Sequence, residues 1–230
     1  MKSNGSGNGS GRVGSLVLAA AMSIGLGFGT HALAVDHSYL IDLKTRTATD
    51  LGSVMANAIN DAGQVVGQFD TADGKSHAFI TGPNGAGMTD LGTLGGYRSY
   101  ASGVNNDGQV VGQSETADGH SHAFITGPNG MIDLGTLGGS DSFATGINAA
   151  GQVTGTSSTG TGGFHAFITG PNGAGMIDLG TLGLRDSYAS GINDSGQVAG
   201  YSMERHGFWH AFITGPNGTG MIDLGTSGEW

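Results

Sequence analysis

The stretch His77-Ala78-Phe79-Ile80-Thr81-Gly82-Pro83-Asn84-Gly85 decides the fold, because it returns three more times along the chain. The nearly unchanged copies begin at His122, His165 and His210, and a degenerate copy begins at His37. Successive copies therefore start about 40 to 45 residues apart, and a fixed period of this length indicates a repeat architecture.

Each repeat unit predicts four short β-strands separated by turns. In the unit from His77 the expected strands are residues 77–82, 88–92, 99–104 and 109–114. Pro-Asn-Gly at the first turn sets φ at proline and tolerates positive φ after it. Residues 93–98 are expected to form a glycine-containing loop, and the turn at residues 105–108 begins with asparagine and ends with glycine.

The units start at residues 37, 77, 122, 165 and 210, and the last one stops after two strands, which predicts 18 strands. If the count begins at the third strand instead, four whole units fit between Val54 and Gly225 and the first hairpin is surplus. The unit from His122 is two residues shorter at its first turn, a change that keeps every side chain on its own face.

Both faces of each predicted sheet carry apolar side chains, since Phe79 alternates with Ala78 and Ile80. A four-stranded sheet of this kind must stack between neighbours, and the period matches the blade of a β-propeller. The expected fold is therefore all-β, a propeller-like array of four-stranded antiparallel repeats over residues 35–230. Either a small ring with one extra hairpin or an open array satisfies the pattern. Residues 155–160, rich in Gly, Ser and Thr, are interpreted as a flexible loop.

The composition restricts the compartment and the partners. The chain has 230 residues, 47 glycines, no cysteine and a net charge of −10. The acidity argues against nucleic acid and anionic membranes as partners, and no disulfide can form. Residues 1–34 resemble a secretory signal peptide, with Lys2 and Arg12, an apolar segment and a small-residue cleavage site at Ala32-Leu33-Ala34. We therefore expect a secreted or periplasmic protein with no membrane span in the mature chain.

The repeated HAF motif, followed by M-x-D-L-G-T-L-G-G and by S-x-A-x-G-I-N-x-x-G-Q-V-V-G, resembles the bacterial extracellular HAF-repeat family. The resemblance extends from about His37 to Gly225. It implies an extracellular glycine-rich repeat protein with no assigned enzymatic activity, and it transfers no catalytic residue.

Histidine and aspartate recur once per unit, and this regularity favours a structural role. Metal ligands must converge on one ion, whereas equivalent positions of separate blades lie apart. We expect each histidine to bond a backbone or aspartate group within its own blade, and we predict no catalytic residue, metal or cofactor. The structural repeat positions are His77, His122, His165, His210, Asp90, Asp133, Asp178 and Asp223.

The residues that break the symmetry are the candidate binding residues. The connection before the last HAF motif carries Arg205, His206, Phe208 and Trp209, where the other units have small polar residues. Tryptophan and arginine are enriched at binding hot spots, although aromatic residues in a terminal repeat also serve as a cap. Tyr97 and Arg98, in the other variable loop, are weaker candidates of the same kind.

Two functions remain open from the sequence. The first is a non-enzymatic binding or interaction module for a glycan or a secreted protein, with self-association as a further possibility. The alternative is a carbohydrate-active or other hydrolytic enzyme on a propeller scaffold. Such an enzyme needs one non-repeated acid or base, and Glu204 with His206 is the only such pair in an asymmetric loop.

Overall fold

A computed structural model describes residues 37–226, and the predicted signal peptide lies outside this range. The described residues contain 18 β-strands and three single-turn 3-10 segments, so the all-β prediction and the strand count are confirmed. Within this range no helix is long and apolar enough to cross a membrane.

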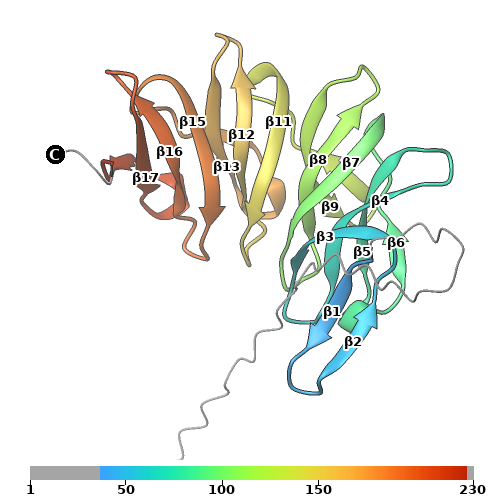
Figure 1. The fold of residues 1–230 in the computed structure, drawn as a ribbon. Coiled ribbons are helices and arrows are strands. Elements are labelled where there is room, and N and C mark those ends of the chain that lie inside the picture. Colours follow the sequence, from blue (N-terminus) through green and yellow to red (C-terminus); the bar gives the residue numbers. More distant parts are fainter. Residues whose placement is uncertain (1–36, 227–230) are drawn as a thin grey trace, which may run out of the picture.

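The strands form one hairpin and four successive antiparallel four-stranded units, called sheets below (Figure 1). The hairpin consists of β1 (Tyr39–Asp42) and β2 (Thr47–Asp50). The first sheet consists of β3 (Val54–Ile59), β4 (Val65–Asp70), β5 (Ser76–Thr81) and β6 (Met88–Asp90). The second consists of β7 (Gly95–Val104), β8 (Val110–Thr116), β9 (Ser121–Gly127) and β10 (Gly130–Asp133). The third consists of β11 (Gly138–Ile147), β12 (Val153–Thr159), β13 (Phe164–Thr169) and β14 (Met176–Asp178). The fourth consists of β15 (Gly183–Ile192), β16 (Val198–Glu204), β17 (Trp209–Thr214) and β18 (Met221–Asp223).

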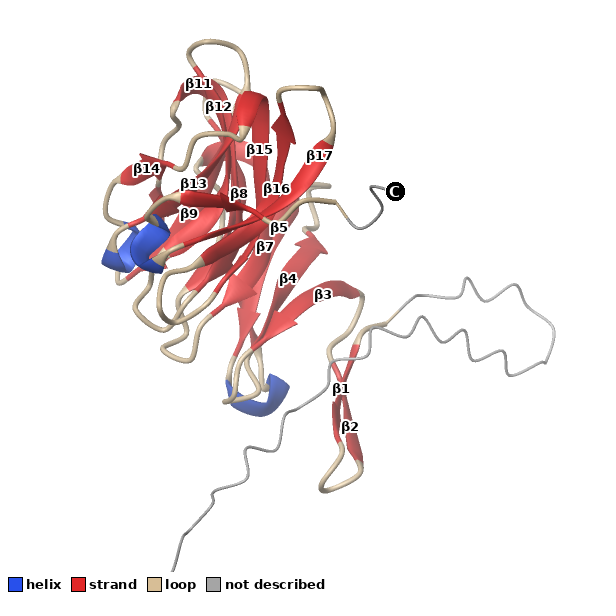
Figure 2. Ribbon diagram, turned by 90° about the vertical axis from the view of Figure 1, so that its left-hand side faces the viewer, coloured by secondary structure: helices blue, strands red, loops and turns tan. Residues whose placement is uncertain are grey.

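Each sheet begins with the third strand of a sequence repeat, which is the second of the two ways of counting the units given above. Each sheet thus combines the last two strands of one repeat unit with the first two of the next, and the β1–β2 hairpin is surplus. Figures 1 and 2 show the sheets stacked in chain order, with the hairpin projecting beyond the first of them. A single parallel bridge between β5 and β7 links the first two sheets. Within residues 37–226 no strand of the fourth sheet packs closely against the hairpin or the first sheet, and Figure 1 shows the sheets arranged as an open arc.

Two local predictions were wrong. Residues 155–160, interpreted as a flexible loop, belong mostly to β12, where Ser157 is fully buried between sheets. The polar composition suggested an exposed loop, but small hydroxyl side chains can be buried in the narrow space between sheets because they form hydrogen bonds with the backbone there. The predicted loop at residues 93–98 is also partly strand, since β7 begins at Gly95 and pairs with Thr116.

The hairpin turns agree with their sequences. Asn84, Asn172 and Asn217 of the three longer turns have φ of 53° to 55°, the left-handed region that asparagine tolerates. The shorter turn of the second sheet leaves two residues between β9 and β10, and it keeps the register, because Phe124 faces Asp133 as Phe79 faces Asp90.

The core lies between successive sheets. Its largest fully buried side chains are the repeated phenylalanines of the HAF motif together with isoleucines and valines, namely Phe79, Phe124, Phe167, Phe212, Ile125, Ile168, Val65, Val66, Val110, Val111, Val153 and Val198. Near the inner edge, Gly103 and Gly146 let their first strands approach the first strand of the next sheet closely. In the second and third sheets both apolar faces predicted from the alternation are therefore used, one against each neighbouring sheet.

Candidate functional site

The repeated histidines and aspartates close the outer hairpin of every unit. Nδ1 of each histidine lies 2.8 to 3.0 Å from the aspartate of its own unit, and a carboxylate can only accept, so the nitrogen donates. The same carboxylate accepts the backbone N–H of the glycine two residues further on, at 2.7 to 2.8 Å. The five pairs are His37–Asp50, His77–Asp90, His122–Asp133, His165–Asp178 and His210–Asp223.

These pairs stay separate from one another. Across residues 37–226 no three His, Asp or Glu side chains converge in a way that could hold a metal ion. Each carboxylate is already engaged by an imidazole and a glycine N–H, and this geometry joins the two strands of one hairpin.

The terminal pairs predict acid sensitivity. The pKa of Asp50 is lowered mainly by the hydrogen bond from the N–H of Gly52 and, to a smaller extent, by the bond from His37. The pKa of Asp223 is lowered in the same way by the N–H of Gly225 and then by His210. Because these folded-state pKa values lie below the unfolded value of 3.8, their stabilisation is present above that pH and is lost as the pH falls through the lowered pKa. We expect the melting temperature to fall as the pH drops below about 4.

A thermal-melt series between about pH 2.5 and pH 7 would measure this effect. Asp223→Asn should reduce the fall of the melting temperature at acid pH. Asp107→Asn, which removes an exposed turn carboxylate, should leave that fall as in the wild type. If the melting temperature of Asp223→Asn fell at acid pH as much as that of the wild type, the contribution assigned to Asp223 would be contradicted.

A ladder of amides joins the inner ends of the sheets. Asn60 accepts the N–H groups of Ala62 and Gln64 through Oδ1, and its Nδ2 donates to the carbonyl of Asn105 in the next sheet at 2.9 Å. Asn105 and Asn148 donate in the same way to the carbonyls of Asn148 and Asn193. The turn asparagine therefore both shapes its own turn and contacts the following sheet.

A second ladder starts from a β-bulge in each first strand. One extra residue, Asn57, Ser102 or Thr145, interrupts the register there and is turned toward the next sheet. Their side chains donate to the carbonyls of Ala101, Ala144 and Ala189, at 2.8, 2.7 and 3.2 Å.

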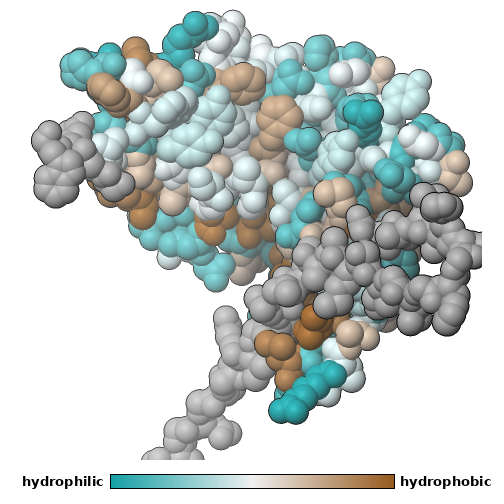
Figure 3. All heavy atoms as spheres, viewed as in Figure 1, coloured by the Kyte–Doolittle hydropathy of each residue, from teal (hydrophilic) through white to brown (hydrophobic). Residues whose placement is uncertain are grey.

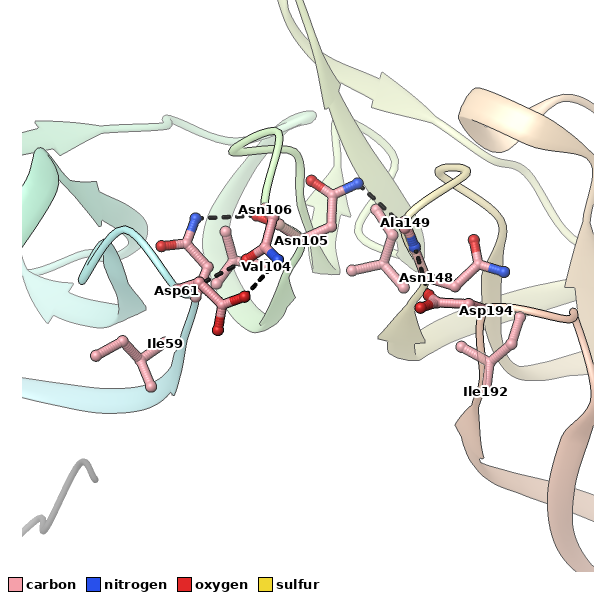
Figure 4. A pocket seen from close by; sticks show the side chains of 11 residues that line it. Ile59, Asp61, Val104, Asn105, Asn106, Asn148, Ala149, Ile192 and Asp194 are labelled. Carbon is pink, nitrogen blue, oxygen red and sulfur yellow. Dashed lines mark hydrogen bonds between the residues drawn. The ribbon is translucent and has the colours of Figure 1, made fainter. Parts of the chain in front are cut away.

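The inner strands line a shallow depression of about 210 Å³ (Figure 4). Its apolar wall is one residue per sheet, Ile59, Val104, Ile147 and Ile192, and the ladder asparagines and Asp61, Asn106, Ala149 and Asp194 form its rim. Asp61 and Asn106 bond each other there. The lining is made of equivalent positions and contains no nucleophile next to a base.

A second depression, of about 380 Å³, lies beside the shortened turn of the second sheet. Thr126, Gly127 and Pro128 line it on one side, and Gln109 and Asn172, which bond each other at 3.1 Å, line it on the other. The depression exists because this turn is two residues shorter than the equivalent turns. The difference in turn length, which is visible in the sequence, could have predicted the depression.

The strongest departure from symmetry is an aromatic cluster on the fourth sheet, formed by Tyr188, Tyr201 and Trp209. The three rings come from neighbouring strands β15, β16 and β17, and their centroids are 5.2 to 5.7 Å apart. Tyr201 and Trp209 remain 45% and 42% exposed. Partial burial of Tyr188, with the charges of Asp186 and Tyr201 nearby, raises its pKa and keeps the phenol neutral.

The cluster lies on the face of the fourth sheet against which no further sheet packs within residues 37–226, and Phe164 of the third sheet stacks against Tyr188 at its margin, with ring centroids 6.2 Å apart. Ala166 is fully buried beneath the fourth sheet, whereas its equivalent, Ala211, is exposed. Leu224 is 61% exposed, while its equivalent Leu179 packs against the next sheet. Figure 3 shows the molecule from one side, where hydrophobic and hydrophilic groups are mixed and no single large apolar patch dominates.

The structure places the predicted binding residues in two separate regions. Trp209 belongs to the aromatic cluster, and Phe208, its neighbour in the chain, is 62% exposed. Arg205 and His206 lie in the exposed turn between β16 and β17. These four residues therefore surround one end of the fourth sheet, whereas Tyr97 and Arg98 lie on another sheet.

Tyr97 and Arg98 belong to β7, where the second sheet meets the first. Tyr97 is 70% exposed, Lys75 Nζ lies 5.8 Å from the centre of its ring, and Arg98 faces Ser76 of β5. This pair is not in contact with the aromatic cluster, so the structure does not unite the two sets of candidates in one site.

Sequence reasoning missed both Tyr188 and Tyr201 as members of the cluster. Aromatic residues also occupy the equivalent positions Tyr100 and Phe143, so Tyr188 does not stand out in the repeat pattern. Its importance comes from the pairing of β15 with β16, which sets Tyr188 opposite Tyr201.

Glu204 and His206 are in contact, but the carboxylate also shapes its own turn. Oε2 of Glu204 lies 2.9 Å from His206 Nδ1, and Oε1 accepts the N–H groups of His206 and Phe208. Partial burial raises the pKa of Glu204, but these N–H groups and the imidazole outweigh it, so the net pKa is lowered. A carboxylate held ionised in this way is poorly suited to act as a general acid.

Comparison with known proteins yields a likeness of fold. Neither a protein-family model nor a curated protein matches the sequence. Among solved structures, TolB from Acinetobacter baumannii is similar at 12% identity with a TM-score of 0.55, over 84% of this chain and 49% of that one. A putative TolB from Agrobacterium tumefaciens is similar at 14% identity with a TM-score of 0.55, over 84% of this chain and 74% of that one. A puromycin hydrolase is similar at 14% identity with a TM-score of 0.50, over 84% of this chain and 35% of that one. The chain thus spans about half the length of the first of these proteins.

Proposed function

We propose that this chain is a non-catalytic binding module that acts outside the cytoplasm and holds its ligand on the aromatic cluster of Tyr188, Tyr201 and Trp209. The observation that carries the proposal is that three rings from three adjacent strands meet on the face of the fourth sheet against which no further sheet packs within residues 37–226. The signal-like residues 1–34 support the proposed location, which is the periplasm or the extracellular space.

The chemistry of the cluster favours a glycan or a segment of a secreted protein as the ligand. Tyrosine and tryptophan combine a broad apolar surface with a hydroxyl or an N–H that can bond a polar partner. The repeated polar side chains also support a non-catalytic function. The His–Asp pairs bond within a sheet and the ladder asparagines bond between sheets, so these side chains already serve to hold the fold together.

A binding screen with a matched pair of variants tests this proposal. The mature chain is applied to a glycan array and to a panel of secreted proteins, and the affinity of any ligand is then measured. Trp209→Ala should weaken binding at least ~10-fold, as expected of a central aromatic contact. Phe208→Ala, which removes an adjacent ring that is 62% exposed, should weaken it much less. Equal losses in both variants, or none in Trp209→Ala, would contradict the assignment of the site.

The alternative is a hydrolase that uses Glu204 and His206, and their 2.9 Å contact is the observation in its favour. Assays on ester and glycoside panels distinguish the two functions. Hydrolysis by the wild-type chain that disappears in Glu204→Gln would favour the enzyme over the binding module.

A further inference from the structure

The β1–β2 hairpin reproduces the outer half of a complete sheet. Tyr39 faces Asp50 as Phe79 faces Asp90, and His37 contacts Asp50 as His77 contacts Asp90. Leu40 packs against Val65 and Phe79 of the first sheet and is only 6% exposed. The hairpin therefore sits on the first sheet as β5–β6 sits on the second.

The inner half of this sheet is absent from the described residues. In the other four copies the strand of the HAF motif pairs with an inner strand, through β4–β5, β8–β9, β12–β13 and β16–β17. Within residues 37–226, β1 pairs with β2 alone. Ser38 uses both its N–H and its carbonyl toward Leu51 and Gly52, which follow β2. Because such bonds alternate along a strand, the backbone groups of Tyr39 and Ile41 point to the open edge.

The first sheet offers matching acceptors beside this edge. The carbonyls of Ala101 and Asn105 accept side-chain donors from the preceding sheet, Asn57 and Asn60. The equivalent acceptors on the first sheet are the carbonyls of Ala56 and Asn60, and no side chain in the described range donates to them. An open strand edge and two carbonyls thus mark the place of two inner strands.

We propose that this edge binds a two-stranded inner hairpin of the same repeat, supplied by another chain. Residues 142–155 of this protein show what such a hairpin requires: Thr145 at the bulge, Asn148 at the turn and Gly155 opposite the HAF strand. Pairing along an exposed edge is an established mode of recognition, with main-chain bonds supplying the affinity. The site is separate from the aromatic cluster and does not depend on the proposed function.

A synthetic peptide of residues 138–159 tests the proposal, with binding to the mature chain followed by fluorescence anisotropy. A control peptide carries Asn148→Ala and Gly155→Val. In the protein, Ile41→Pro removes one N–H from the open edge, and an edge strand tolerates proline where its N–H faces outward. We expect the wild-type peptide to bind, and both the control peptide and the Ile41→Pro protein to lower the affinity at least ~10-fold.

Circular dichroism melts of Ile41→Pro establish that the variant is folded, and hydrogen exchange of the wild type should show new protection at Tyr39 and Ile41 when the peptide is bound. Binding that is insensitive to Ile41→Pro would overturn the proposal, as would no binding. A dimer that forms without peptide and persists in Ile41→Pro would indicate docking of whole sheets between copies, and would also contradict it.

Discussion

Gly155→Ala is expected to destabilise the protein by about 3 kcal/mol or more, because a backbone contact leaves no room for a side chain. A Cβ at this position would lie 2.0 Å from the carbonyl oxygen of Phe143 and 2.8 Å from the ring of Phe167. Neither neighbour can retreat easily, since the oxygen belongs to a bulged strand and the ring is fully buried. Chemical denaturation of the purified variant would measure the loss.

Gly191→Ala is the matched control, because it adds the same methyl group to a strand of another sheet of the same kind. No atom lies within 4 Å of a Cβ placed there, and the backbone does not require glycine. We expect a change within about 0.5 kcal/mol, as for surface substitutions generally. Equal stability of the two variants would show that the bulge does not constrain Gly155 as described.

Removal of residues 35–52 is expected to produce aggregation or larger oligomers, together with a lower melting temperature. The deletion takes away Leu40, which packs against Val65 and Phe79, and the bond from Ser38 Oγ to the carbonyl of Val54. Full burial of one leucine contributes about 1.5 to 3 kcal/mol, and the deletion also exposes the two core residues beneath it. The hairpin covers a face of the first sheet, so the newly exposed surface is mainly apolar.

Light scattering and thermal melts of the truncated chain measure this effect. Leu43→Ser is the control within the same hairpin, because Leu43 is 59% exposed and its replacement should leave both readouts nearly unchanged. A truncated chain that stays monomeric with an unaltered melting temperature would show that the first sheet does not need the hairpin.

Local chemistry explains why much of the fold could be predicted. Pro-Asn-Gly and Asn-x-x-Gly each specify a turn through the φ angles and side-chain bonds that their residues favour. The alternation of Phe79 with Ala78 and Ile80 then predicts strands with two apolar faces. These signals act over a few residues, so the 18 strands and their hairpins follow from the sequence.

The sequence by itself thus determined the repeat period, the strands and the hairpins. Tertiary structure alone decided that the sheets begin at Val54, that bulged residues such as Ser102 reach the next sheet, and that Tyr188 meets Tyr201 and Trp209. The physical reason is that these features depend on pairing and stacking between segments distant in the chain. Identical repeats carry the same local preferences, and only their position in the stack makes Ala166 buried and Ala211 exposed.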